Sequence, residues 1–427
     1  MLDLKCYNMM TGFSRGGFTI MANKKRTIIG AVVLVVVTAI LTSVLTIQVM
    51  AYKTIKSGDS IISRTKYTRL KEYNQLDEVR NILEQYYIEE PDADEMVTGA
   101  IKGLVASLGD PYTYYFTSEE YKDFMERTQG SYAGVGMWVT IDEEDNQITI
   151  IKTFEGSPAF DAGIIAGDKI IKVDDTLVDG SSMDKAVAMM RGEPGTEVRV
   201  TVLREGKEKE HTLKRAVVQI PDIEYEMLEE DIGYIWLYQF DEKSDKNFKA
   251  ALDDLKEQGM EGLILDLRGN PGGLLDSCVN IADILLPKGI VTYREDRAGN
   301  REDYNSDADH LDIPLVVLVD QDSASASEVL SGAIQDYGAG TIIGKTTYGK
   351  GVVQTLKPFK DGSALKFTNS KYFTPKGRDI HKKGVVPDIE VDMTEEAIEF
   401  LKENPNEDLP RKLDAPLLKG IDELKSK

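Results

Sequence analysis

Hydrophobic residues follow three successive patterns along this chain, and the first is a long apolar run. The segment Thr27–Tyr52 contains no charged residue and exceeds the roughly 20 residues that cross a bilayer as a helix. We therefore predict a single transmembrane helix over residues 27–52. Residues 24–26 are Lys-Lys-Arg, so the positive-inside tendency places residues 1–26 in the cytoplasm and the rest of the chain outside the cell membrane. A cleaved secretory signal is the alternative, and Met21 is a candidate for the true start.

The second pattern is helical and occupies residues 53–128. Apolar residues recur at helical spacing in two segments of this region. They are Leu76, Val79, Leu83 and Tyr86 in the first segment, and Met96, Ile101, Leu104, Val105 and Leu108 in the second. Gly109 and Pro111 then supply a normal helix-ending signal. We predict two helices here, the second ending at Gly109.

The third pattern consists of short strand-like runs. In residues 129–215 the runs GVGMWVTI, NQITIIKTF, KIIKVDD and EVRVTVL are typical of strands, with one helix, SSMDKAVAMMRG, between them. In residues 216–392 apolar strands alternate with helical segments, which predicts an α/β core of packed layers. We predict that residues 393–427 form an acidic, helical C-terminal tail.

Composition narrows the possible functions. A chain of 427 residues is long enough for two or three folded units. Its 51 basic and 73 acidic residues give a net charge of -22, which argues against a nucleic-acid partner. The two cysteines, Cys6 and Cys278, do not make a disulfide framework. Three histidines without an H-E-x-x-H motif do not make a zinc peptidase. We expect no metal or organic cofactor.

Candidate chemistry lies where two predicted strands end. The strand PLVVLVD leads into QDSASASE, so Ser325 begins a helix whose unpaired N–H groups and dipole favour an anion. The strand in GLILDLRGNPGG ends in a glycine-rich turn that brings further N–H groups close. An oxyanion formed at Ser325 is therefore expected to accept hydrogen bonds from Ala326 and from either Gly272 or Gly273.

A serine hydroxyl needs a neighbouring base before it can act as a nucleophile. Lysine serves when burial keeps its amine neutral, whereas arginine stays protonated. Lys350, Val352 and Gln354 alternate with Gly351 and Val353, so in a strand the lysine and the glutamine would share one face. Gln354 would then orient the Lys350 amine without adding a charge.

Simpler interpretations of these residues remain open. Ser325 and Glu328 form S-x-x-E, which is also a helix capping box. Lys350 by itself resembles a solvated surface lysine. His310 and His381 leave a Ser-His mechanism conceivable.

Residues 129–215 resemble a PDZ domain. The resemblance rests on the loop Tyr132–Met137, the run GSPAFDAGIIAGDKIIKVDD and the helix that follows. A loop of this kind aims backbone N–H groups at a peptide's terminal carboxylate, and the next strand pairs with the peptide. The expected peptide-binding residues are Gly134, Val135, Gly136 and Met137 in the loop and Val187 and Met190 beside the groove. Core roles for Val187 and Met190 are the alternative.

The chain as a whole resembles the carboxyl-terminal processing (tail-specific) peptidase family. The matching runs include GLVASLGDPYTYYF, LILDLRGNPGGLL, SASASEVLSGAIQDYGAGTIIGKTTYGKGVVQT and FTPKGRDIHKKGVVPDIEV. With the PDZ region, they cover nearly everything from about Leu76 to Val391 without a visible departure. The resemblance implies a PDZ domain inserted ahead of a Ser-Lys protease core, with Ser325 as nucleophile, Lys350 as base and Gln354 in support.

The predicted function is that of a membrane-anchored serine endopeptidase. Its PDZ domain would capture proteins or peptides with free, unstructured C-termini, and its Ser-Lys dyad would cut upstream of the captured tail. The resemblance also favours a homodimer. The alternatives are a membrane-tethered PDZ adaptor with an inactive protease-like domain, and a hydrolase of small esters.

Overall fold

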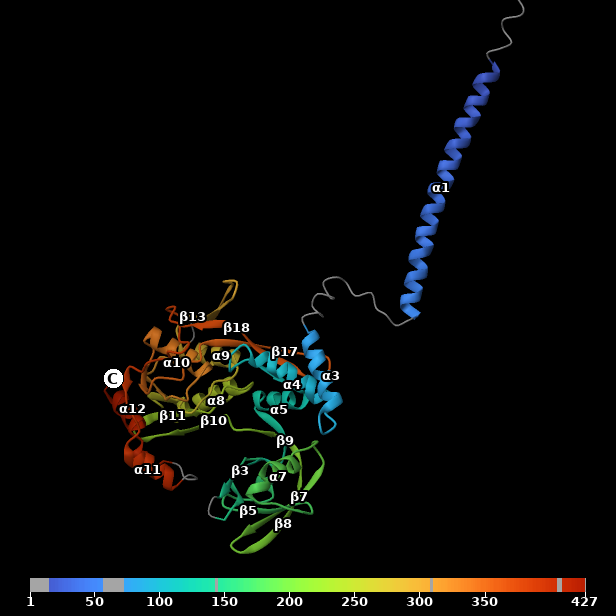
Figure 1. Ribbon diagram of the computed structural model, residues 1–427. Helices are drawn as coiled ribbons and strands as arrows, with labels where there is room; N and C mark the ends of the chain where they lie inside the picture. Colours follow the sequence, from blue (N-terminus) through green and yellow to red (C-terminus); the bar gives the residue numbers. More distant parts are fainter. Residues whose placement is uncertain (1–14, 57–72, 143–144, 308–309, 405–408, 427) are drawn as a thin grey trace, which may run out of the picture. The chain divides into compact units, whose positions relative to one another are not determined.

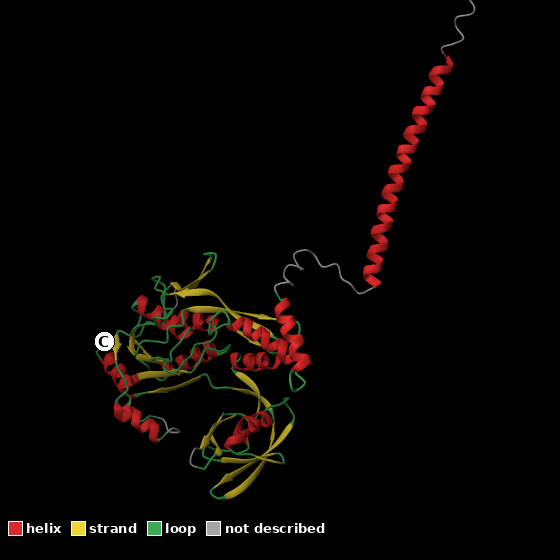
Figure 2. Cartoon of the chain, viewed as in Figure 1, coloured by secondary structure: helices red, strands yellow, loops and turns green. Residues whose placement is uncertain are grey.

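The computed structural model describes residues 15–56, 73–142, 145–307, 310–404 and 409–426. Many of its elements are labelled in Figure 1, and helices, strands and loops are coloured by type in Figure 2. The chain divides into two compact units between Met96 and Val97. Cys6 lies outside the described residues.

The first unit is helical. Helix α1 (Arg15–Lys56) contains the segment Ile28–Met50, which is long and apolar enough to cross a membrane. Helix α3 (Asn74–Tyr86) forms where the spacing of apolar residues predicts it. Helix α4 (Ala93–Ala106) begins in this unit and ends in the next. The φ of 64° at Gly109 is the left-handed conformation that favours glycine after a helix.

A six-stranded sheet forms the centre of the second unit. Its strands run in the order β10-β11-β12-β15-β16-β19. Their bounds are β10 (Ile223–Met227), β11 (Ile232–Leu237), β12 (Gly262–Asp266), β15 (Leu315–Val319), β16 (Thr341–Gly344) and β19 (Ile389–Glu390). Strand β10 is antiparallel to β11, and the others are parallel to their neighbours.

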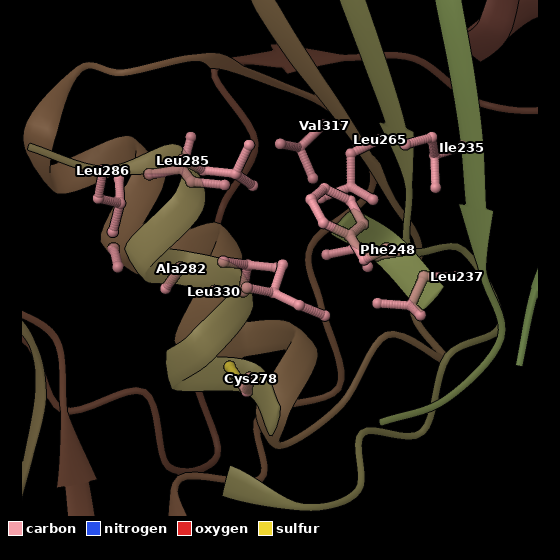
Figure 3. Close-up of a cluster of buried hydrophobic side chains, with 14 of the residues drawn as sticks. Ile235, Leu237, Phe248, Leu265, Cys278, Ala282, Leu285, Leu286, Val317 and Leu330 are labelled. Carbon is pink, nitrogen blue, oxygen red and sulfur yellow. The ribbon is translucent and has the colours of Figure 1, made fainter. Parts of the chain in front are cut away.

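Helices cover both faces of this sheet because its central strands are apolar on both sides. The covering helices are α8 (Ser244–Glu257), α9 (Leu275–Leu285) and α10 (Ala326–Tyr337) on one face, and α12 (Ala415–Lys425) on the other. Figure 3 shows the first interface, where Phe248 and Leu330 pack with Leu265 and Val317. Cys278 lies in the same cluster, fully buried, and its thiol donates to the Ala326 carbonyl at 3.2 Å.

The C-terminal region is part of this layered fold. Helix α11 (Glu395–Glu403) is followed by α12, whose Leu417 and Leu424 pack against Val316 and Leu318 of β15. The acidic composition of residues 393–427 suggests a solvated tail, but the apolar face of α12 completes the core.

Parallel strands place their carboxyl ends at one edge of a sheet, and ligands of open α/β sheets bind at that edge. The loops that leave β11, β12, β15 and β16 there carry Phe240, residues 268–273, Ser325 and Lys350. The fold therefore gathers segments far apart in sequence into one site.

A second sheet, which the sequence patterns did not predict, carries the segment after Lys350. Its antiparallel strands are β1 (Tyr114–Phe116), β13 (Gly289–Asp296), β14 (Arg301–Ser306), β17 (Val352–Pro358) and β18 (Ala364–Phe373). Helix α5 (Ser118–Thr128) follows β1. Charged residues interrupt these strands, as in the REDYNS run of β14, so they lack a clear apolar alternation.

The β-rich domain has its own sheet and core. Strand β2 (Ser131–Gly134) pairs with β9 (Ala216–Gln219). The larger sheet contains β3 (Met137–Asp142), β4 (Gln147–Thr153), β5 (Lys169–Val173), β6 (Thr176–Leu177), β7 (Glu197–Arg204) and β8 (Lys207–Lys214). Its helices are α6 (Pro158–Asp161) and α7 (Met183–Met190).

Candidate active site

Ser325 lies at the turn from β15 into α10, in a backbone conformation that is unusual for a residue with a side chain. Its φ is 56° and its ψ is −110°, and conformations of this kind cost on the order of 1–3 kcal/mol unless their surroundings hold them. Ser325 precedes the first turn of α10, where backbone N–H groups point outward. Its side chain is partly exposed and forms a capping box with Glu328, in which the hydroxyl oxygen accepts and its proton stays available for transfer. The geometry suits a nucleophile.

The side chains of the two neighbouring serines, Ser323 and Ser327, are both used in hydrogen bonds to the main chain. Ser323 is buried and its hydroxyl donates to the Leu267 carbonyl at 2.8 Å. Ser327 is also buried and its hydroxyl donates to the Asn270 carbonyl at 3.0 Å. Both side chains hold the loop after β12, so Ser325 is the one whose hydroxyl is available.

Residues 268–273 lie directly against Ser325. A Cβ added to Gly272, whose φ is 98°, would stand 2.8 Å from Ser325 Cβ and 2.9 Å from the Ala326 nitrogen. A Cβ on Gly273 would collide with the Phe240 carbonyl. Only glycine permits these close approaches. They bring the loop backbone to the N-terminus of α10.

Asn270, which the sequence analysis did not single out, organises this loop. Its buried side chain donates to the Leu237 carbonyl at 2.8 Å and accepts from the Gly272 N–H at 2.8 Å. Its own carbonyl accepts from Ala324 N–H at 3.0 Å. Because Gly272 N–H is already used, Gly273 is the better placed of the two glycines to donate to an oxyanion.

Lys350 lies in the loop between β16 and β17. Its Nζ is 5.0 Å from the centre of the Tyr112 ring. Burial lowers the pKa of Lys350, and the nearby positive charge of Lys366 lowers it further, whereas Glu328 and Asp110 oppose both effects. A lowered pKa is what a lysine general base requires.

Gln354 does not share a regular strand with Lys350 as predicted. Lys350 precedes β17, and the pairing of β17 with β18 is irregular between Val353 and Gln354. Strict alternation therefore does not apply between the two. The Gln354 amide donates to the Val352 carbonyl at 3.1 Å. No hydrogen bond joins the side chains of Ser325, Lys350 and Gln354 in the described part of the chain.

Ser325 and Lys350 are linked instead through the side chain of Glu328. The N–H groups of both residues donate to the same carboxylate oxygen of Glu328, at 2.9 Å and 2.8 Å. The S-x-x-E pattern pointed to the first of these bonds, but nothing local in the sequence pointed to the second. His381, the histidine considered as an alternative base, has its main chain beside Gly351 and makes no contact with Ser325 among the described hydrogen bonds.

Arg268, at the start of the glycine-rich loop, is held by two acidic residues. Its guanidinium donates to Asp266 and, at 2.7 Å and 2.9 Å, to both oxygens of Asp414. The same Asp414 accepts from the Leu417 N–H at 3.1 Å, as the N-cap of α12. The C-terminal helix is thereby connected to the loop that faces Ser325.

In the β-rich domain, the predicted groove residues are largely packed inside. Val135, Met137 and Met190 belong to the buried core, and Val187 packs against it while partly exposed. The carbonyls of Val135 and Gly136 accept from Ala159 and Phe154, at 2.9 Å and 3.1 Å. Gly134 lies under the Tyr132 ring, where a Cβ would come within 2.6 Å of the ring.

Comparison with known proteins identifies the family. Residues 231–391 match the model of peptidase family S41, residues 135–214 that of the PDZ domain, and residues 29–120 that of the activating protease CtpB N-terminal domain. A CtpA-like serine protease of Staphylococcus aureus (strain COL) is 37% identical over 359 residues, covering 83% of this chain and 71% of the relative. The chain belongs to peptidase family S41.

Further similarities agree with this assignment. The carboxy-terminal processing protease CtpA of Bacillus subtilis (strain 168) is 35% identical over 374 residues, covering 85% of this chain and 77% of the relative. A solved S41 protease from Bacteroides fragilis NCTC 9343 has the same fold, with a TM-score of 0.52, 16% identity and coverage of 80% and 91% of the two chains. This S41 chain is thus a serine-type C-terminal processing protease with a PDZ domain, as the sequence predicts.

Proposed function

We propose that this S41 protease cleaves peptide bonds through a Ser325-Lys350 dyad. The observation that carries the proposal is the single Glu328 oxygen that accepts from both backbones and so brings the two residues together. The strained turn at Ser325 and the lowered pKa of Lys350 are what the two roles require. An inactive adaptor is not favoured, because it needs neither feature.

In the proposed reaction, the neutral Lys350 amine takes the Ser325 hydroxyl proton as Oγ attacks the carbonyl carbon of the substrate. The carbonyl oxygen becomes an oxyanion that accepts from the N–H groups of Ala326 and Gly273. The Lys350 ammonium then returns its proton to the departing amine, which leaves an acyl-enzyme for water to hydrolyse. Gln354 is proposed to orient the Lys350 amine for this proton transfer.

The PDZ domain is proposed to select substrates by their C-terminal tails. Its Gly134–Met137 loop would supply N–H groups for the terminal carboxylate, and the strand β3 would pair with the tail. Val187 is the groove residue that remains partly exposed. Substrates are then proteins or peptides with free, unstructured C-termini.

The apolar segment of α1 is proposed to anchor the enzyme in the cell membrane. The basic residues 24–26 would stay in the cytoplasm and the protease would lie outside. A cleaved signal near the N-terminus passes the same test of length and composition, so N-terminal sequencing of the mature protein decides between them. Because the chain resembles the carboxyl-terminal processing peptidase family, we also propose that the enzyme forms a homodimer.

Covalent labelling tests the proposed nucleophile. The full chain, purified in dodecyl maltoside, is treated with a fluorophosphonate probe and digested for mass spectrometry. We expect the label on Ser325, and none in Ser325→Ala. Ser323→Ala is the matched control and should still be labelled. A label of undiminished intensity in Ser325→Ala would refute the assignment.

A further inference from the structure

Glu328 has an environment that a helix cap alone does not require. It lies in the first turn of α10 and its side chain is completely buried. One carboxylate oxygen accepts from the N–H groups of Ser325 and Lys350, at 2.9 Å and 2.8 Å. The other accepts from the Gly349 N–H at 2.7 Å and the Thr347 hydroxyl at 2.5 Å.

The four hydrogen bonds to Glu328 favour its charged carboxylate form. A carboxylate has about four lone-pair sites, and a protonated acid would have to donate at one of them. Three backbone N–H groups and the Thr347 hydroxyl donate to the two oxygens, an arrangement that suits the carboxylate form. No Lys or Arg side chain forms an ion pair with it among the described residues. Backbone dipoles and the N-terminus of α10 stabilise its charge instead.

Three of the four donors belong to the segment that presents Lys350. Residues Thr347, Gly349 and Lys350 form no regular strand, so backbone pairing in a sheet does not fix them. The fourth donor is the N–H of Ser325, whose positive φ makes its orientation costly to maintain. Backbone bonds from Tyr348 N–H to the Ser323 carbonyl and from Lys382 N–H to the Gly349 carbonyl also hold this segment, but Glu328 is the side chain that bonds to the main chain on both sides of the site.

We propose that Glu328 is a positioning residue that holds the backbones of the nucleophile and the base in register through a single carboxylate. The inference rests on the proposed roles of Ser325 and Lys350. It adds a residue that touches neither substrate nor the reacting atoms, but sets the distance over which the proton moves.

The anion also acts on the base directly. The groups that face the Lys350 amine are Lys366 on β18, Glu328 on α10, and Asp110 and Tyr112 after α4. Burial and Lys366 lower the pKa of Lys350, and Glu328 and Asp110 raise it. Removing the Glu328 charge must therefore lower that pKa further.

The test is Glu328→Gln in the full chain in dodecyl maltoside, with casein as substrate and kcat and KM measured across pH. The amide keeps the shape of the side chain, but its NH2 group faces two of the donors that the carboxylate accepts from. Those two hydrogen bonds are lost, so the backbones of Ser325 and Lys350 are no longer held in place relative to each other. We expect kcat to fall about 100-fold, the scale of an ångström-sized misplacement, with little change in KM. The midpoint of the rising pH limb should move to lower pH, because the amine loses its anion.

Thr347 supplies the second pair of variants. Its hydroxyl donates to Glu328 and accepts from the Val385 N–H at 2.7 Å. Thr347→Ser keeps both bonds and should retain nearly full kcat, whereas Thr347→Val loses both and should fall about tenfold, the factor expected for one or two lost buried bonds. If Glu328→Gln does not fold, the Thr347 variants test the positioning role of Glu328 in its place.

Two results overturn the proposal. One is a Glu328→Gln enzyme with wild-type kcat. The other is a reduced kcat with an unmoved pH midpoint and with equal losses in Thr347→Ser and Thr347→Val, which indicates a merely structural role. Ser325→Ala is measured alongside: if it still cleaves casein, the dyad itself is wrong, whereas if it is inactive while Glu328→Gln is normal, only the positioning role fails.

Discussion

The substitution Asp414→Asn tests whether the C-terminal helix stabilises the catalytic domain. In the wild type, both Asp414 oxygens accept from Arg268, at 2.7 Å and 2.9 Å, and both side chains are mostly buried. Asparagine keeps the shape and one acceptor, so the N-cap bond to Leu417 survives. It loses the negative charge and places an amide NH2 group against the guanidinium.

The size of the effect follows from the geometry. Removing one partner of a buried ion pair costs about 3–5 kcal/mol, and the remaining partner Asp266 keeps the loss near the lower limit, at about 3 kcal/mol. With an m-value of roughly 3 kcal/mol per molar urea for a domain of this size, the unfolding midpoint should fall by about 1 M.

Tryptophan fluorescence measures this change locally. The chain has two tryptophans, and the indole N–H of Trp236 donates to the Arg268 carbonyl at 3.4 Å. In a Trp138→Phe background, fluorescence therefore reports urea unfolding of the domain that contains Arg268. Asp422→Asn removes the same charge from an exposed position of α12 and is the control. A midpoint equal to that of the control would refute the reasoning.

Three further predictions concern activity and stability. Lys350→Arg should be as inactive on casein as Lys350→Ala, because guanidinium stays protonated; substantial activity would exclude lysine as the base. Ser323→Ala and Ser327→Ala should retain substantial casein cleavage, and losses in both equal to that of Ser325→Ala would contradict the assignment of Ser325 as the nucleophile. Burial raises the pKa of Asp241, and the nearby Asp222 raises it further. The folded protein therefore favours the protonated acid, and it loses stability as pH rises from the pKa of Asp241 in the unfolded chain through its pKa in the folded one. Asp241→Asn should therefore be more stable than wild type at pH 7 and lose this advantage near pH 4 in thermal unfolding, and a pH-independent difference would contradict the assignment.

The sequence predicts those parts of the fold that leave a local pattern. Apolar runs place β12 and β15 correctly because burial on both sides of a parallel sheet needs continuous apolar residues, and a helix was correctly predicted to begin at Ser325. Strand β14 was not predicted, since half-exposed antiparallel strands tolerate charged residues. The packing of α12 was obscured by the acidic composition of residues 393–427.

The residues of the candidate site were also predicted only where they leave a local pattern in the sequence. Ser325 and Lys350 were found from motif spacing, and the relation of Lys350 to Gln354 was misjudged because a register irregularity cannot be seen in a sequence. Asn270 and Tyr112 were missed, as each acts through residues distant in the chain. The cap formed by Glu328 was visible, but its bond to Lys350 depends on a loop closing from 22 residues away.

The most direct test of the account is a comparison of one peptide in two forms. A casein segment that spans a bond cut by the wild-type enzyme, but not by Ser325→Ala, is extended to an apolar C-terminus and synthesised as free acid and as amide. Amidation removes the charge that the Gly134–Met137 loop is proposed to bind and leaves the scissile bond unchanged. We predict a kcat/KM that is about 10- to 100-fold higher for the free acid, as expected for the loss of charge-assisted hydrogen bonds. Equal kcat/KM values for the two peptides would contradict tail capture by the PDZ domain.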